Sequence, residues 1–284
     1  MNTLEKKFTL CCNGKIISLE EPKIMGIVNA TPDSFYSKSR CNSEKEIIEK
    51  TQKHLLEGAT FIDLGAFSTR PGCENIPEEE EIKRLDFALK IITDNFPQAI
   101  ISVDTFRSKV AEFSLDKYGV AIINDISGGM LDEKIFETVG KYHAAYILMH
   151  MKGNPQNMQQ FCDYQDITAE VTDFFIRQSK KAEAMGINDI ILDPGFGFAK
   201  NLDQNYLLMS QMDSFKILQK PILVGISRKS MLFKLLNITP EEALEATTAL
   251  NTIALNKGAN ILRVHEVKPA YQAVKICSKA NFLG

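Results

Sequence analysis

The sequence predicts an α/β fold, a (β/α)8 TIM barrel with an N-terminal β-hairpin. Three observations support it: eight short apolar runs alternate with helix-forming segments, the chain has 284 residues, and the apolar runs end in polar or turn-forming residues. Short buried strands that alternate with helices pair in parallel. A barrel of eight such strands takes about 250 residues, so residues 1–284 are expected to form one domain.

Residues 7–19 predict the hairpin, because two β-rich runs flank Asn13-Gly14, a strong two-residue turn signal. The expected barrel strands are apolar runs bounded by turn-forming residues. They are Lys23–Asn29, Phe61–Leu64, Ile100–Val103, Ala121–Asn124, Ala144–Met149, Asp189–Leu192, Pro221–Val224 and Asn260–Val264.

Helices are expected where apolar residues recur at helical spacing between the strands. One begins at Pro77 and the acidic residues that follow it, since negative charge stabilises a helix amino terminus. Another is expected soon after the Pro221–Val224 strand, with Ser227 as its N-cap. The other expected helices are Glu44–Leu56, Arg107–Tyr118, Glu133–Tyr142, Tyr164–Met185 and Pro269–Ala280. A doubly wound open sheet is the alternative, but its usual G-x-G-x-x-G turn is absent after Asn29.

Composition and charge exclude several classes of protein. The net charge of -3 gives no footprint for nucleic acid or an anionic membrane. No apolar run is long enough to span a bilayer, and the first residues lack the pattern of a signal peptide. The six cysteines form no C-x-x-C pair, so we expect free thiols and a cytoplasmic location.

Polar residues stand where the predicted strands end, and in a barrel these ends meet at one mouth. The stretch from Ile191 to Phe198 is the most informative, because its apolar strand stops at Asp193 before Pro-Gly. A single Asp there is equally typical of a turn or helix cap. A set of buried carboxylates and amides, however, needs partners such as the N–H groups of a ligand. The strand-end residues expected to converge are Asn29, Asp63, Asp104, Asn124, Met149, Asp193, Gly225 and Arg263.

Cations at two further places indicate a ligand. Arg228 and Lys229 begin a predicted helix, where positive charge opposes the helix dipole. Arg263 and His265 are two apart on the last strand and so face the same side. A cation and an imidazole there suit a phosphate, although a rim histidine is the structural alternative. No zinc-protease, P-loop or nucleophile-elbow motif is present.

Taken together, these motifs resemble the dihydropteroate synthase family. The matching segments, in family order, are Gly26–Phe35, Ile62–Gly72, Ser102–Thr105, Ile123–Gly129, Leu148–Met151, Leu192–Phe198, Gly225–Ser230 and Arg263–His265. The resemblance implies a (β/α)8 barrel, usually a homodimer, that uses Mg2+. It implies condensation of 6-hydroxymethyl-7,8-dihydropterin diphosphate with p-aminobenzoate, giving 7,8-dihydropteroate and diphosphate.

The same resemblance assigns roles to residues of this chain. Asp104, Asn124 and Asp193 are expected to bind the pterin, with Lys229 on its carbonyl side. Arg263 and His265 are expected at the diphosphate, with Asn29 as the Mg2+ ligand. Asp104, Asp193, Lys229, Arg263 and His265 form the expected catalytic set. The remaining substrate-binding residues are Asp63, Met149, Phe198 and Gly225 around the pterin, and Phe35, Thr69, Arg70, Pro71 and Ser230 around p-aminobenzoate.

Two departures from the family pattern are present. The first loop, Ser34–Cys41, lacks the family's glycine pair, and Ala199 stands where the family has glycine. Two other functions stay open: a pterin-binding methyltransferase barrel that uses a corrinoid, and a non-catalytic homologue. The first has no reason to keep Ser68–Gly72, and the second would be indicated by losses at Asn29, Asp104 or Lys229.

Overall fold

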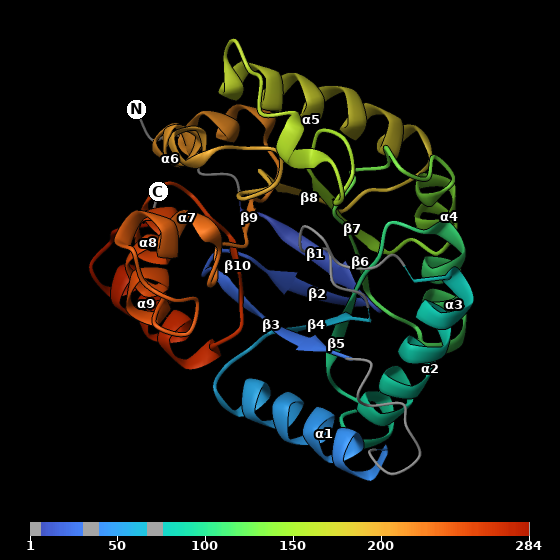
Figure 1. Cartoon of the computed structure of the whole chain (residues 1–284). Coiled ribbons are helices and arrows are strands. Elements are labelled where there is room, and N and C mark those ends of the chain that lie inside the picture. Colours follow the sequence, from blue (N-terminus) through green and yellow to red (C-terminus); the bar gives the residue numbers. More distant parts are fainter. Residues whose placement is uncertain (1–6, 31–39, 67–75, 284) are drawn as a thin grey trace.

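The computed structural model describes residues 7–30, 40–66 and 76–283. Eight parallel strands form the central sheet in the order β8-β7-β6-β5-β4-β3-β10-β9, with helices around the outside (Figure 1). A parallel bridge between Leu192 and Ile222 joins the two end strands and closes the barrel. The predicted fold class is therefore confirmed. The strands are β3 (Lys23–Asn29), β4 (Phe61–Gly65), β5 (Ile100–Asp104), β6 (Ile122–Asp125), β7 (Ala145–Met149), β8 (Ile190–Asp193), β9 (Leu223–Val224) and β10 (Ile261–Val264).

Each predicted helix is present with shifted ends, and two helices were not predicted. Within the described part of the chain they are α1 (Arg40–Leu56), α2 (Glu78–Asn95), α3 (Ser108–Tyr118), α4 (Ile135–Lys141), α5 (Ile167–Ala184), α6 (Leu202–Ser210), α7 (Ser230–Leu236), α8 (Leu244–Asn256) and α9 (Val267–Lys279), with 3-10 turns η2 (Met158–Gln160) and η3 (Met212–Leu218). The unpredicted helices are α6 and α8. None of the described helices is long and apolar enough to cross a membrane.

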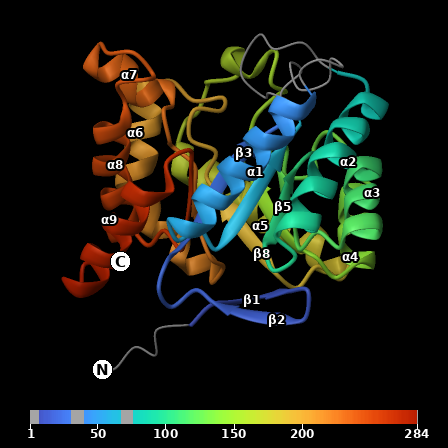
Figure 2. The same cartoon turned by 90° about the horizontal axis from the view of Figure 1, so that it is seen from below.

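The hairpin closes the amino end of the barrel, opposite the carboxyl ends of the strands (Figure 2). Its strands β1 (Thr9–Cys12) and β2 (Lys15–Ser18) are antiparallel, and Asn13 and Gly14 adopt φ values of 51° and 74°. Positive φ at both central residues is the turn that Asn-Gly favours. The hairpin's apolar side chains join an interior cluster that includes Leu10, Cys12, Leu19, Phe61, Ile147, Ile191, Leu223 and Ile261.

Alternation along the strands decides which residues face the barrel interior. On β10, Ile261 belongs to the interior cluster while Leu262 packs in the outer core beneath the helices. Since strand side chains alternate, Arg263 faces the interior with Ile261. The same reasoning on β4 places Asp63 on the side of Phe61. The polar strand-end residues therefore continue the interior of the barrel toward its carboxyl end.

Candidate active site

Arg263 is the centre of a buried polar cluster contributed by four strands. Its Nε donates to Asp63 Oδ2 at 2.7 Å, and its Nη2 donates to Asp104 Oδ2 at 2.8 Å. Asn124 Nδ2 donates to the same Asp63 oxygen at 3.2 Å. The cluster thus draws together β4, β5, β6 and β10. The sequence predicted this convergence, but it did not predict that Arg263 pairs with two carboxylates.

The cluster retains unused acceptors that point to a ligand. Among the described residues, Asp63 Oδ1 and Ser102 Oγ are buried without a hydrogen-bond partner. They occupy neighbouring positions on β4 and β5. Burial raises the pKa of Asp104 to about 7, although Arg263 acts to lower it. A buried oxygen without a donor costs free energy, so a ligand with N–H groups would be stabilised here.

Asp193 and Lys229 both contact the loop that follows β8. Asp193 Oδ1 accepts a hydrogen bond from the Gly195 backbone N–H at 2.8 Å. Lys229 Nζ donates to the Phe196 carbonyl at 2.6 Å and lies 4.6 Å from the centre of the Phe198 ring. Burial raises the pKa of Asp193 and lowers the pKa of Lys229 to about 8, while the attraction between the two groups opposes both shifts.

His265 and the Ser227 hydroxyl form the neighbouring part of the mouth. The His265 backbone N–H donates to Ser227 Oγ at 3.3 Å, and the two side chains meet at 3.0 Å from Nδ1. Ser227 is therefore not the N-cap of α7, as the sequence had indicated; Lys229 holds that position without a side-chain cap bond. The Arg228 side chain does not join this group; its Nη2 pairs with Glu266 Oε1 at 2.6 Å.

The other predicted site residues have different environments. Met149 is buried in a small apolar cluster that Phe198 packs against, and Gly225 is buried with Arg263 Cβ 3.7 Å from where its own Cβ would be. Asn29 is exposed at the end of β3, and Ser230 is the half-buried first residue of α7. Four predicted residues lie outside the described ranges: Phe35, Thr69, Arg70 and Pro71.

The sequence did not single out Lys200, which lies close to the site. Lys200 is only 3% exposed, and its Nζ reaches the carbonyls of Gly195 and Phe198, both at 3.0 Å. It also lies 3.0 Å from His150 Nδ1. A lysine is rarely buried without a carboxylate partner. Its place directly after Ala199, in a glycine-containing stretch that resembles the family pattern, was a signal that could have found it.

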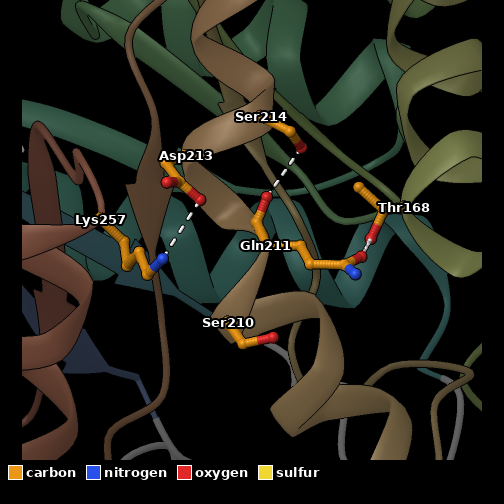
Figure 3. Close-up of a pocket in the computed structure, with 6 residues that line it drawn as sticks. All are labelled: Thr168, Ser210, Gln211, Asp213, Ser214 and Lys257. Carbon is orange, nitrogen blue, oxygen red and sulfur yellow. Dashed lines mark hydrogen bonds and ion pairs between the residues drawn. The ribbon is translucent and has the colours of Figure 1, made fainter.

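A surface hollow on the helical side of the barrel is unrelated to the mouth (Figure 3). Its polar groups satisfy one another: Lys257 pairs with Asp213 at 3.3 Å, and Thr168 donates to Gln211 at 2.6 Å. It contains no predicted site residue. The residues that line it are Thr168, Ser210, Gln211, Asp213, Ser214 and Lys257. The hollow therefore shares no residue with the candidate site at the mouth of the barrel.

Carboxylates and amides cluster at the carboxyl end of this barrel, the end at which barrel enzymes carry their active sites. The family described as "Pterin binding enzyme" matches residues 25–265 of the chain. This range begins in β3 and ends at His265, so it includes every strand of the barrel and all the predicted site residues. The chain belongs to this family of pterin-binding enzymes.

Relatives identify the particular enzyme. The chain is 40% identical to the dihydropteroate synthase of Escherichia coli K12 over 269 residues, 94% of each chain. It is 40% identical to that of Synechocystis over 256 residues, 89% of this chain and 88% of the other. These relatives place the chain among the dihydropteroate synthases, which are transferases of folate biosynthesis, and favour that activity over the corrinoid-dependent alternative.

Solved structures agree with this placement. Yersinia pestis dihydropteroate synthase in a sulfonamide drug complex has a TM-score of 0.89 and 36% identity, over 96% of this chain and 99% of the other. The Thermus thermophilus enzyme in complex with 4-aminobenzoate has a TM-score of 0.85 and 33% identity, with the same coverage.

Proposed function

We propose that this chain joins a dihydropterin diphosphate to p-aminobenzoate at the mouth of the barrel, with the pterin ring bound by Asp104, Asn124 and Asp193. The observation that carries the proposal is the buried acceptor set around Arg263. A 2-amino-4-oxo pyrimidine edge presents adjacent N–H donors, which a carboxylate accepts well. Lys229 supplies the opposite polarity for the ring carbonyl. Asp63 supports the ring site through its unpartnered Oδ1.

The diphosphate is proposed to lie at the ends of β3 and β10, which are neighbouring strands. His265 is half-buried there, and Arg263 extends between this point and the acidic cluster. A guanidinium makes charge-assisted hydrogen bonds to phosphate oxygens. Negative charge grows on the diphosphate as it leaves, so these groups stabilise the departing anion more than the bound substrate.

Asn29 is the proposed protein ligand for Mg2+. It is exposed at the end of β3 and carries an amide oxygen, the type of ligand that Mg2+ accepts. In the described part of the chain no three His, Cys, Asp or Glu side chains gather into a metal site. One amide ligand fits an ion that takes its other ligands from water and substrate phosphate. When bound, Mg2+ would neutralise charge on the diphosphate.

The p-aminobenzoate is proposed to bind above Phe198, with Ser230 near its carboxylate. Met149 and Gly225 would line the adjoining pterin pocket. Phe35, Thr69, Arg70 and Pro71 are proposed to complete the p-aminobenzoate pocket, on the family resemblance alone. Sulfonamides, which mimic p-aminobenzoate, would compete at this place.

The proposed reaction is a displacement at the exocyclic methylene of the pterin. The bond from this carbon to the diphosphate oxygen breaks, and diphosphate takes the electron pair. The positive charge left on the pterin is stabilised by the carboxylates of Asp104 and Asp193. The amine nitrogen of p-aminobenzoate then bonds to the carbon and loses a proton, so no covalent intermediate with the enzyme is required.

We further propose a cytoplasmic homodimer in which residues 1–284 form one pterin-binding domain. Large apolar side chains are exposed on α6, α7 and α8, which lie beside one another (Figure 2). These are Leu207, Leu235, Leu236 and Ile253, each about half exposed. The free thiols of Cys11, Cys12, Cys162 and Cys277 fit a reducing compartment. Sedimentation of the wild type beside a Leu235→Glu/Leu236→Glu variant tests the dimer.

Diphosphate release tests the proposed function. We expect release that requires both the pterin substrate and p-aminobenzoate, stops when a chelator removes divalent cations, and returns with added Mg2+. Asp193→Asn should bind no pterin in calorimetry yet melt like the wild type. Its Oδ1 can still accept from Gly195, but its amide turns an N–H toward the N–H groups of the ring. Release at the same rate with and without p-aminobenzoate would contradict the assignment.

A further inference from the structure

Lys200 is buried against backbone carbonyls and an imidazole. Besides the carbonyls of Gly195 and Phe198 and His150 Nδ1, its Nζ lies 3.5 Å from the His150 carbonyl. Burial lowers the pKa of Lys200 to about 7, and the negative charge of Asp193 opposes this shift. The Asp193 and Lys200 side chains share no hydrogen bond in the described structure. Burying a lysine amine without a carboxylate partner costs free energy, so the segment that Lys200 holds in place indicates its role.

The loop that Lys200 holds contacts two of the side chains proposed to bind the pterin, Asp193 and Lys229. The Gly195 N–H orients the Asp193 carboxylate, while the carbonyl of the same residue accepts from Lys200. The next carbonyl, that of Phe196, accepts from Lys229 at 2.6 Å. The Nζ atoms of two lysines therefore hold one short loop: Lys229 at the mouth and Lys200 from within the protein.

His150, which contacts Lys200 Nζ through its ring, is itself held in place by neighbouring residues. Its ring packs edge-on against Phe174 at 5.0 Å between centroids, and its backbone N–H donates to the Asp193 carbonyl at 2.9 Å. Burial lowers the pKa of His150 well below its usual value, and the charge on Lys200 lowers it further. The imidazole is therefore neutral, and its Nδ1 accepts from the ammonium while the ring proton lies on Nε2.

A close backbone contact shows how tightly the loop lies on β7. A Cβ atom at Gly195, where φ is 68°, would be only 2.1 Å from the His150 carbonyl oxygen. Only glycine permits this approach. The loop thus lies against His150, whose ring nitrogen also accepts from Lys200. We expect loss of the Lys200 contacts to shift the positions of the Gly195 N–H and the Phe196 carbonyl.

We propose that Lys200 is a positioning residue for pterin recognition: its Nζ, held against neutral His150, fixes residues 194–200 so that Asp193 and Lys229 face the pterin ring. The inference rests on the pterin contacts proposed above for these two residues. Lys200 does not touch the substrate. The alternative is that it only stabilises the fold, and the two roles differ in what its removal does to ligand affinity.

Lys200→Met tests the proposal, because methionine fills the same space without donating hydrogen bonds. We expect its Kd for 6-hydroxymethylpterin, measured by calorimetry, to rise about tenfold or more, as expected when buried acceptors lose their donor. The Kd for inorganic diphosphate with Mg2+ should stay within about twofold of the wild type, since Arg263 and His265 are left in place. The KM for the pterin substrate should rise likewise, while that for p-aminobenzoate stays within about twofold.

Lys152→Met is the matched control. Lys152 lies in the same region, but its Nζ pairs with Glu170 at 2.8 Å and lies over the Tyr164 ring at 3.6 Å. Its hydrogen bonds in the described structure go to Asp163 and Glu170 rather than to residues 194–200, although its charge acts on Lys200 through space. We expect wild-type affinities for both ligands, which would show that loss of a nearby positive charge is not sufficient.

His150→Phe keeps the proposal testable if Lys200→Met does not fold. It removes one acceptor of Lys200, so pterin affinity should fall by about threefold, and the double variant should be no weaker than Lys200→Met alone. A folded Lys200→Met protein with wild-type pterin affinity would overturn the inference, as would equal loss of both ligands. If Asp193→Asn also keeps pterin affinity, the proposed pterin site itself is wrong; if Asp193→Asn loses it, only the role of Lys200 is wrong.

Discussion

At the scale of single residues, Arg263 determines the charge state of the mouth. One guanidinium partly offsets two carboxylates that would otherwise repel each other in a buried site. Asp63 and Asp104 raise the pKa of Arg263 in return, so it stays charged at every physiological pH. The arginine therefore belongs to the pterin site as well as to the proposed diphosphate site.

Arg263→Ala should consequently weaken both ligands. Removing one partner from a buried ionic cluster typically costs about 3 kcal/mol, because the remaining charges lose their compensation. Calorimetry should find weaker binding of bare pterin and of diphosphate, with a lower melting temperature. His265→Ala should weaken diphosphate alone, since His265 contacts Ser227 rather than the acidic cluster. Unchanged affinity for bare pterin in Arg263→Ala would restrict the arginine to the diphosphate.

The raised pKa of Asp104 predicts a pH dependence of stability. In the folded protein this pKa is about 7, against an ordinary value of 3.8, so the folded state binds the proton more tightly. The contribution of Asp104 to the free energy of unfolding is therefore full below about pH 4 and is lost as the pH rises through 7. The melting temperature of the wild type minus that of Asp104→Asn should therefore fall between pH 5 and 8. Other titrating groups, including Lys229 and Lys200, are present in both proteins and largely cancel. A difference that does not change with pH would contradict the shift.

At the scale of elements, the sequence predicted the strands and the convergence of their polar ends, but it missed two helices and the pairing of individual side chains. Strands were found because apolar runs stop at polar or turn-forming residues. The helix α6 is short, and its Asn201–Gln204 capping box was its best signal. The helix α8 is rich in Thr, a weak helix former. Arg263 was given a phosphate role because a cation beside an imidazole suits a phosphate, yet its carboxylate partners are 200 and 159 residues away in the sequence.

The loop after β8 contains a departure from the family whose cost can be weighed. Ala199 is fully buried with φ 47°, in the left-handed region. Glycine would relieve about 1 kcal/mol of strain, but it would lose roughly 0.8 kcal/mol of methyl burial and about 0.4–1 kcal/mol in the unfolded chain. Ala199→Gly should thus melt within a few degrees of the wild type with unchanged pterin affinity. A large gain in stability would mean that the strain was underestimated.

At the scale of the whole molecule, the hairpin and the polar cluster around Arg263 lie at opposite ends of the barrel. The hairpin seals the amino end, where Cys11 N–H donates to Asp189 at 3.0 Å and Asn13 donates to the Gly119 carbonyl at 2.7 Å. The polar cluster lies at the carboxyl end, with layers of interior side chains between the two. In barrels, residues at the amino end serve stability and those at the carboxyl end serve function.

Leu10→Ala should lower the melting temperature without changing substrate binding at the mouth. Leu10 is 1% exposed in the interior cluster, and truncating a buried leucine costs about 2–5 kcal/mol. For a chain of this size each kcal/mol lowers the melting temperature by roughly 2–4 °C. The KM values for both substrates should stay at wild-type levels below the melting temperature, because the contacts around Arg263 are left intact. Ile16→Ala is the control on the same hairpin: Ile16 is 77% exposed, so neither melting nor kinetics should change. A raised KM in folded Leu10→Ala protein would show that packing at the amino end transmits to the site, which the separation of the hairpin from the polar cluster argues against.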